Sequence, residues 1–269
     1  MTNSSLLWLR VATVLYAFGL VHAALWLTRQ RDSLFRVSFG AFAVGSLFHL
    51  VSITEEGLQQ GRFPVSDIFQ TLSLCGFLIA ASFLFVYWRY RTASLSVFIF
   101  PLVFVLAVMA GLSSSFPGWS SPTVRSASLI AHIIFILLGY AALLFTAVAA
   151  VAYLFQEQQL KSKNPRGLAL RLPPLGTLDE LISSSLSLGF VAITIGTVIG
   201  AVWAFVEFGT KWITDPRIGI SFVTWGIYLA LVFFRVTAGW RGRKAALLAI
   251  AALCCSVVTW ITHVGILAG

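Results

Sequence analysis

The sequence predicts an all-α membrane protein, a polytopic helix bundle with about eight transmembrane helices. Of its 269 residues, 59% are hydrophobic and only 10% are charged, which excludes an ordinary water-soluble globule. The apolar residues gather into eight runs without interior charge, close to the roughly 20 residues that a helix needs to cross a bilayer. Runs of this length exclude a membrane β-barrel, whose strands are about ten residues long and alternate in polarity.

The eight predicted spans follow one another with short connections. They cover approximately residues 5–27, 34–54, 66–88, 94–112, 127–155, 184–206, 220–236 and 245–267. The first is long, has Arg10 just inside its start, and precedes no small-residue cleavage site, so we expect it to stay as a membrane span. No loop exceeds about 30 residues, too short to fold alone. We therefore expect a single integral membrane domain over 1–269.

Two helix starts carry local signals. Ser66 or Asp67 is available to cap the third span after Pro64. Before the sixth span, Pro173 and Pro174 break any helix, and Thr177 with Glu180 fits a capping box. We expect a surface loop with a short interfacial helix there.

Placement of the basic residues predicts the topology. The chain carries a formal net charge of +9, and 13 of its 18 Lys and Arg fall in alternate loops. By the positive-inside rule these loops are cytoplasmic, which puts both termini and the loop "EFGTKWITDPRIGIS" (207–221) on the outer, periplasmic side. The basicity therefore reflects topology, and we expect no nucleic-acid partner. Lipid is the surrounding medium of a multi-pass protein.

Cysteines and catalytic motifs add little. Cys75, Cys254 and Cys255 all lie within spans, where we interpret them as small core residues. The sequence has no nucleophile elbow, Walker motif, HExxH or intramembrane carboxylate pair, so ordinary enzymatic catalysis has little support. Any chemistry would consist of positioning a cofactor.

Four histidines are the most informative residues, because an ionisable group within a span is costly and is by default a functional candidate. The topology places His49, His132 and His263 near the outer surface and His22 toward the cytoplasmic half. A histidine that simply hydrogen-bonds to a neighbouring helix is the alternative for each. Imidazole is a common axial ligand of haem iron. Zinc competes, but a tetrahedral site needs more ligands than this side offers.

Several segments resemble, in the same order, the CcsA-type cytochrome c assembly proteins, a haem-handling family with CcmC- and HemX-like members. "AHIIFILLGYAALLFTAVAAVAYL" (131–154) is similar to the histidine-led span of that family, and "GRFPVSDIFQTLSL" to the segment in which a proline and a small polar pair precede "YESL". "LGFVAITIGTVIGAVWA" resembles the span that leads into the tryptophan-rich WWD motif, and "TWGIYLALVFFR" with "GWRGRKAA" the span and basic loop after it. The resemblance covers about residues 40–269, with a degenerate WWD-type loop at about 203–221.

The WWD-type loop retains about half of the family signature. Gly209, Trp212 and the pair Asp215-Pro216 match, whereas Phe208, Thr214 and Ile218 stand where the family has Trp, Trp and Glu. The seventh span ends in "FFR" where many members read "LHxR", so His22 lacks the inner-side histidine that would be its partner.

The resemblance implies that haem b, as substrate or cargo, is held on the outer face between two histidines and presented to the CxxCH of an apocytochrome c. His132 matches the first histidine. The second, normally in a loop beyond the last span, has no counterpart before Gly269, and His263 is the substitute at the right depth. These two are the predicted iron ligands. Arg217 could pair with a haem propionate. The complete set of predicted haem-binding residues is His22, His49, His132, Trp203, Trp212, Asp215, Arg217 and His263.

Three functions are considered for a protein with these features. The first is a haem-delivery subunit of cytochrome c biogenesis in the bacterial inner membrane, with a ResB/CcsB-like membrane partner; it could belong to a haem lyase or synthase system, and whether it is itself an enzyme stays open. The second is a HemX-like regulator or scaffold of haem biosynthesis without catalytic haem, which the worn WWD-type loop favours. The third is a small transporter, against which stands the lack of an inverted repeat or paired broken helices.

Overall fold

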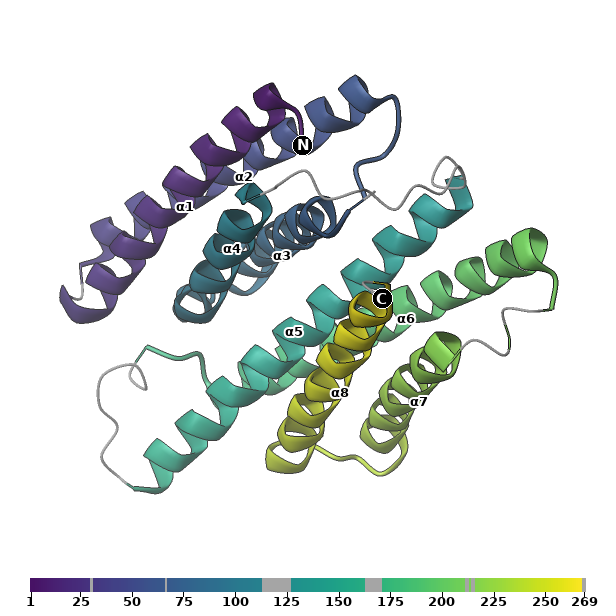
Figure 1. Ribbon diagram of the computed structural model, residues 1–269. Coiled ribbons are helices and arrows are strands. Elements are labelled where there is room, and N and C mark those ends of the chain that lie inside the picture. Colours follow the sequence, from purple (N-terminus) through teal and green to yellow (C-terminus); the bar gives the residue numbers. More distant parts are fainter. Residues whose placement is uncertain are drawn as a thin grey trace. The chain divides into compact units, whose positions relative to one another are not determined.

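The computed structural model is all helical in the part of the chain that it describes (Figure 1). That part comprises residues 1–29, 31–65, 67–112, 127–162, 171–210, 213 and 216–267; the side chains of 216–217 and 259–267 are not described. The helices divide into two compact units. Unit 1 holds α1 to α4, and unit 2 holds α5 to α8.

Each predicted span corresponds to one helix, so the fold class is confirmed. The helices are α1 (Asn3–Arg29), α2 (Asp32–Gln60), α3 (Ile68–Tyr90), α4 (Ser96–Gly111) preceded by a 3-10 turn η1 (Ala93–Leu95), α5 (Ala127–Lys161), α6 (Leu175–Phe208), α7 (Pro216–Thr237) and α8 (Arg243–Leu267). Within the described residues, seven of them are long and apolar enough to cross a membrane, and α8 has 25 residues. The chain is thus a multi-pass membrane protein.

In unit 1, small residues allow α1 and α2 to pack closely. A Cβ atom on Gly45 would approach the Tyr16 ring to 3.1 Å, and Ser38 Oγ donates to the Gly19 carbonyl oxygen at 2.6 Å. Phe42 of α2 stacks on Phe100 of α4, with ring centroids 3.9 Å apart. Aromatic packing of this kind, together with close backbone contact, stabilises helix association in a bilayer.

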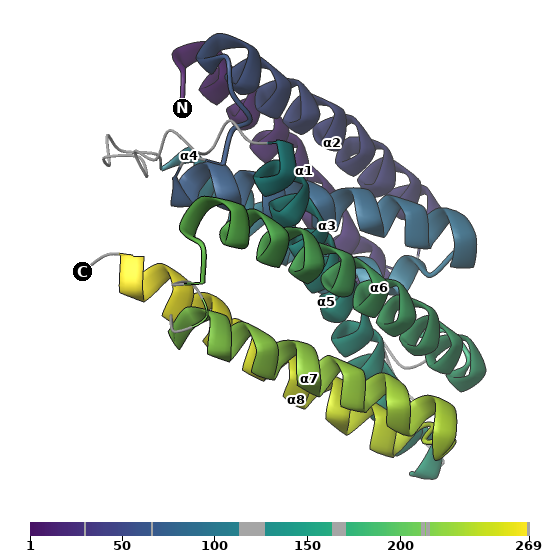
Figure 2. The same ribbon diagram turned by 90° about the vertical axis from the view of Figure 1, so that its right-hand side faces the viewer.

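In unit 2, α5 and α6 form a long antiparallel pair against which α7 and α8 pack. The buried core includes Leu143 of α5, Leu186 and Ile193 of α6, and Tyr228 of α7. α7 and α8 lie side by side and are joined at one end (Figure 2). Because successive helices run in opposite directions, the start of α5, the end of α6, the start of α7 and the end of α8 all lie at the same end of this unit (Figure 1).

Local capping was predicted correctly at α3 and incorrectly at α6. Asp67 caps α3, its carboxylate accepting from the backbone N–H of Gln70 at 2.8 Å. α6 begins at Leu175 directly after Pro174, without a side-chain cap, and continues into the span, so Thr177 lies inside the helix. α6 runs without a break from Leu175 to Phe208, so the residues described after Pro174 form no separate interfacial helix.

The interpretation of two cysteines as core residues was also wrong. Cys254 and Cys255 of α8 are exposed, whereas Cys75 of α3 is partly buried. Large apolar side chains such as Val14, Phe85 and Val206 are also exposed, as expected of helices that face lipid. A small, weakly polar thiol is tolerated on such a surface as well as in a core.

Candidate functional site

The candidate site is built around His132 in the second turn of α5. Its ring points toward α6, where Nδ1 lies 2.7 Å from the carbonyl oxygen of Gly196. A carbonyl oxygen can only accept, so Nδ1 carries the proton and Nε2 carries the lone pair of the neutral imidazole. This is the arrangement in which a protein orients a histidine for metal ligation, because the hydrogen bond at one nitrogen fixes the tautomer at the other.

Two glycines of α6 make room for this histidine. A Cβ atom on Gly200 would overlap the His132 ring, and one on Gly196 would come within 3.1 Å of the Ile136 backbone nitrogen. The two glycines are four residues apart and therefore share one face of α6. Their lack of side chains lets the backbones of α5 and α6 approach closely. The imidazole ring of His132 thus packs directly against the backbone of Gly200.

Trp203 continues the same face of α6 toward the end of the helix. It follows Gly200 by three residues, about one turn, and its ring meets that of Phe208 edge-on with centroids 5.7 Å apart. Its indole nitrogen is buried and has no hydrogen-bond partner among the described residues. A buried N–H normally finds an acceptor, so this one is available to an oxygen of a bound molecule.

α7 braces the α5–α6 pair behind the site. The hydroxyl of the fully buried Tyr228 donates to the Gly139 carbonyl oxygen at 3.1 Å, and the Trp225 indole donates to Thr194 Oγ1 at 3.1 Å. The tyrosine fits because Gly189 has no side chain; a Cβ atom there would lie 2.6 Å from its hydroxyl oxygen. These bonds fix the helices that carry His132 and Trp203.

The WWD-type loop joins α6 to α7 at the same end of unit 2. α6 ends at Phe208, and Gly209 turns the chain with a φ of 62°. Trp212 and Asp215 lie outside the described residues. Arg217 lies in the first turn of α7, and His263 lies four residues before the end of α8. The backbone thus brings these two positions to the end of the unit that holds His132, and their side chains are among those not described.

The two remaining histidines belong to unit 1. His49 is completely buried in α2, and both of its ring nitrogens have partners: Nδ1 lies 3.2 Å from the Tyr16 hydroxyl and Nε2 lies 3.0 Å from Ser73 Oγ. His22 lies near the end of α1, its Nδ1 2.9 Å from the Phe18 carbonyl oxygen. His49 therefore links three helices, whereas His22 bonds only within its own helix.

The opposite end of unit 2 has an ion pair between α6 and α7. Arg235, at the end of α7, donates to both carboxylate oxygens of Asp179 at 3.2 and 2.9 Å, and to the Asp179 carbonyl oxygen at 2.9 Å. The same carboxylate accepts from the backbone N–H of Gly242 at 3.2 Å. The start of α6 is thereby bonded to the α7–α8 connection.

The chemistry of the donor set around His132 fits haem. An oriented imidazole supplies a nitrogen ligand for iron, Trp203 supplies apolar surface, and its unpartnered indole N–H supplies a donor. Sequence reasoning predicted His132 and Trp203 as haem-binding residues and did not single out Gly196, Gly200, Tyr228 or Trp225. The spacing of the two glycines in "GTVIG" was the signal that could have found the first pair.

The fold and the site define a multi-pass membrane protein with an oriented histidine at one end of a helix bundle. The chain belongs to the cytochrome c assembly protein family, whose model matches residues 8–264. This match extends further toward the N-terminus than the predicted 40–269.

Three similar proteins each carry the name cytochrome c biogenesis protein CcsA. That of Gloeobacter violaceus is 26% identical, over 98% of this chain and 91% of its own length. That of Guillardia theta is 23% identical, with the same two coverages of 98% and 91%. That of Prochlorococcus marinus strain MIT 9312 is 30% identical, over 70% of this chain and 69% of its own length.

Proposed function

We propose that this protein is a haem-handling membrane subunit of cytochrome c biogenesis. The observation that carries the proposal is the hydrogen bond from His132 Nδ1 to the Gly196 carbonyl oxygen. It leaves Nε2 as the ligand nitrogen of an imidazole that packs against Gly200, one turn before Trp203 on α6. The names of the similar proteins support this function and give no support to the HemX-like regulator or to a transporter.

In this proposal haem b is the substrate, and His132 Nε2 would bind its iron. The Gly196 carbonyl orients the imidazole and fixes the proton on Nδ1, which raises the basicity of Nε2 as a ligand. Trp203 packs against the porphyrin and donates its indole N–H to a polar group of haem. Bound haem supplies an iron centre and vinyl groups; the protein supplies the binding surface and the orientation.

The second half of the proposed site rests on the resemblance and on position in the fold. His263 is the proposed second iron ligand, because the end of α8 lies at the same end of unit 2 as the start of α5. Trp212, Asp215 and Arg217 of the WWD-type loop are proposed to complete the haem surface, with Arg217 pairing with a propionate. The haem edge would then face an apocytochrome c outside the membrane.

The proposed location is the bacterial inner membrane, with the haem site on the periplasmic side, as the positive-inside rule predicts. A ResB/CcsB-like membrane protein is the proposed partner that brings the apocytochrome. Whether the assembly acts as a haem lyase depends on that partner, since the described residues of this chain provide an iron ligand and a binding surface.

The test is a reduced-minus-oxidised absorption spectrum of the protein purified in detergent from haem-replete cells. We expect a bis-histidine haem spectrum in the wild type and its loss in His132→Ala and in His263→Ala. Leu138→Ala is a matched control on α5, because Leu138 is 38% exposed and lies outside the site. Wild-type protein without haem would overturn the proposed function, and a His263→Ala variant with an unchanged spectrum would overturn the second ligand.

A further inference from the structure

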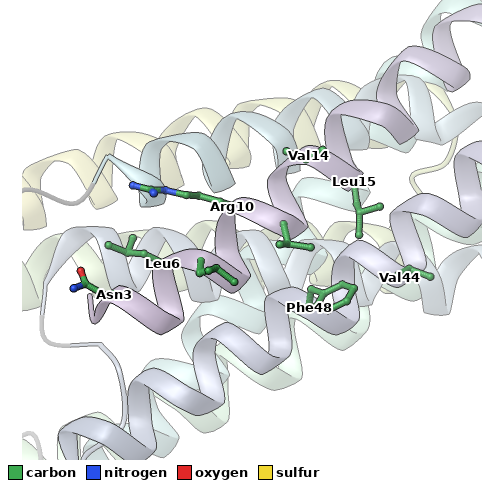
Figure 3. A pocket seen from close by; sticks show the side chains of 9 residues that line it. Asn3, Leu6, Arg10, Val14, Leu15, Val44 and Phe48 are labelled. Atoms are coloured by element: carbon green, nitrogen blue, oxygen red, sulfur yellow. The ribbon is translucent and has the colours of Figure 1, made fainter.

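Unit 1 has an open hollow on the surface of α1 and α2, lined by none of the predicted haem-binding residues (Figure 3). Its volume is about 750 Å³. Two polar residues, Asn3 and Arg10, lie toward its α1 start, and apolar residues form the rest of the wall, including Val14, Leu15, Val44 and Phe48. The hollow therefore has one polar end and one long apolar part.

Arg10 makes the hollow unusual. It is an exposed arginine within a membrane-spanning helix, and among the described residues its side chain makes no ion pair or hydrogen bond. A charged side chain in a span is costly unless it reaches the interface or finds a counter-charge. Figure 3 shows Arg10 extending toward the end of α1 where Asn3 lies. A long side chain that extends toward the nearer end of its span can bring its charge to the membrane interface.

The geometry points to a phospholipid with an anionic headgroup as the occupant of this hollow. Arg10 would bind the phosphate of the headgroup by a charge-assisted hydrogen bond, with Asn3 beside it. One acyl chain would then lie along Val14, Leu15 and Val44. From Asn3 to Val14 the helix rises about 16 Å, at 1.5 Å per residue, so the polar end and the apolar wall are separated along the membrane normal as the two parts of a lipid are.

The lining residues favour a lipid over a helix of a partner protein. Helices associate in membranes through small residues that let their backbones approach. Apart from Asn3 and Arg10, the walls of this hollow are made only of Leu, Val and Phe side chains. Such walls suit a flexible acyl chain. The single cation complements the net negative charge of an anionic headgroup, whereas the ammonium of a zwitterionic headgroup offsets the attraction of its phosphate to Arg10.

Native mass spectrometry of the protein released from nanodiscs tests the inference. The nanodiscs contain equal amounts of phosphatidylglycerol, which is anionic, and phosphatidylethanolamine, which is zwitterionic. We expect the wild type to retain phosphatidylglycerol in at least several-fold excess. Arg10→Gln should lose this preference, and Val44→Trp, which fills the apolar part, should lose the retained lipid altogether.

Two control variants lie on the same helix outside the hollow. Arg29→Gln removes a charge at the other end of α1, and Val21→Trp adds bulk to an exposed position that does not line the hollow. Both should retain phosphatidylglycerol as the wild type does. Equal retention of the two lipids by the wild type, or unchanged retention in Arg10→Gln, overturns the inference. So does crosslinking of a Val14→Cys variant to a polypeptide in native membranes with no lipid retained.

Discussion

At the scale of single residues, the distinction between His132 and His49 lies in their hydrogen bonds. His132 has one ring nitrogen bonded to a backbone carbonyl oxygen, which leaves Nε2 for a ligand role. His49 has both nitrogens bonded to hydroxyl groups and no exposed surface. A buried imidazole with two partners joins α1, α2 and α3. Removing it would take this partner from the Ser73 hydroxyl and from the Tyr16 hydroxyl, which also donates to Ser46 Oγ at 3.4 Å. We therefore assign haem ligation to His132 and helix association to His49 in the proposal.

Gly200 provides the sharpest test of the site at this scale. In Gly200→Ala the new methyl group overlaps the His132 ring, so the imidazole must leave its position above α6. We expect haem content to fall several-fold and the free energy of unfolding to drop by about 1–3 kcal/mol, the usual cost of overpacking. The measurements are the haem-to-protein ratio and thermal unfolding in detergent.

Gly226→Ala is the matched control for this variant. Gly226 lies in α7 of the same unit, and a Cβ atom there would have nothing within 4 Å. Because alanine is the better helix former, this variant should keep its haem and be equally or slightly more stable. Normal haem content in Gly200→Ala would show that the position of the His132 ring does not govern haem binding.

At the scale of elements, helix ends were predictable where their signals are local. Asp67 caps α3 by accepting from the backbone N–H of Gln70, only three residues further along the chain. The sequence offered Ser66 or Asp67 as this cap. The start of α6 was predicted too late. Asp179 is bonded to Arg235, 56 residues away, and that pairing depends on how α6 and α7 pack. The partner of His132 is likewise a carbonyl 64 residues away, which no local pattern of apolar residues indicates.

The Asp179–Arg235 pair gives a prediction about an element junction. Asp179→Ala removes the acceptor of two Arg235 bonds and of the Gly242 N–H, and it leaves a mostly buried guanidinium without its counter-charge. We expect the free energy of unfolding to fall by about 1–2 kcal/mol, since the carboxylate is partly exposed to solvent. Hydrogen exchange should become faster in residues 238–242.

The control for the junction is an ion pair within a single helix. Glu157 and Lys161 of α5 are 2.9 Å apart, and the lysine is largely exposed. Glu157→Ala should change the stability by no more than about 0.5 kcal/mol, as for other exposed pairs at this spacing. Equal effects of the two variants would mean that the Asp179 bonds do not hold the α7–α8 connection in place.

At the scale of the whole molecule, the spans could be predicted from sequence because length and apolarity are enough to define them. The orientation of the bundle in the membrane is predicted only from the distribution of basic residues between its loops, because the helices themselves do not distinguish the two sides of the membrane. It decides whether the His132 end of unit 2 faces the periplasm, where an apocytochrome would receive haem. A direct test of orientation is therefore a test of the proposed function at this scale.

Cysteine labelling of intact cells provides that test. In a background with the three native cysteines replaced by alanine, Ile213→Cys marks the α6–α7 connection and Ala238→Cys marks the α7–α8 connection at the other end of α7. Both positions are exposed. A membrane-impermeant maleimide should label Ile213→Cys in intact cells and Ala238→Cys only after permeabilisation, because the basic loop after α7 is predicted to be cytoplasmic. The reverse pattern would place His132 on the cytoplasmic side, where it could load haem but could not present it to a periplasmic acceptor.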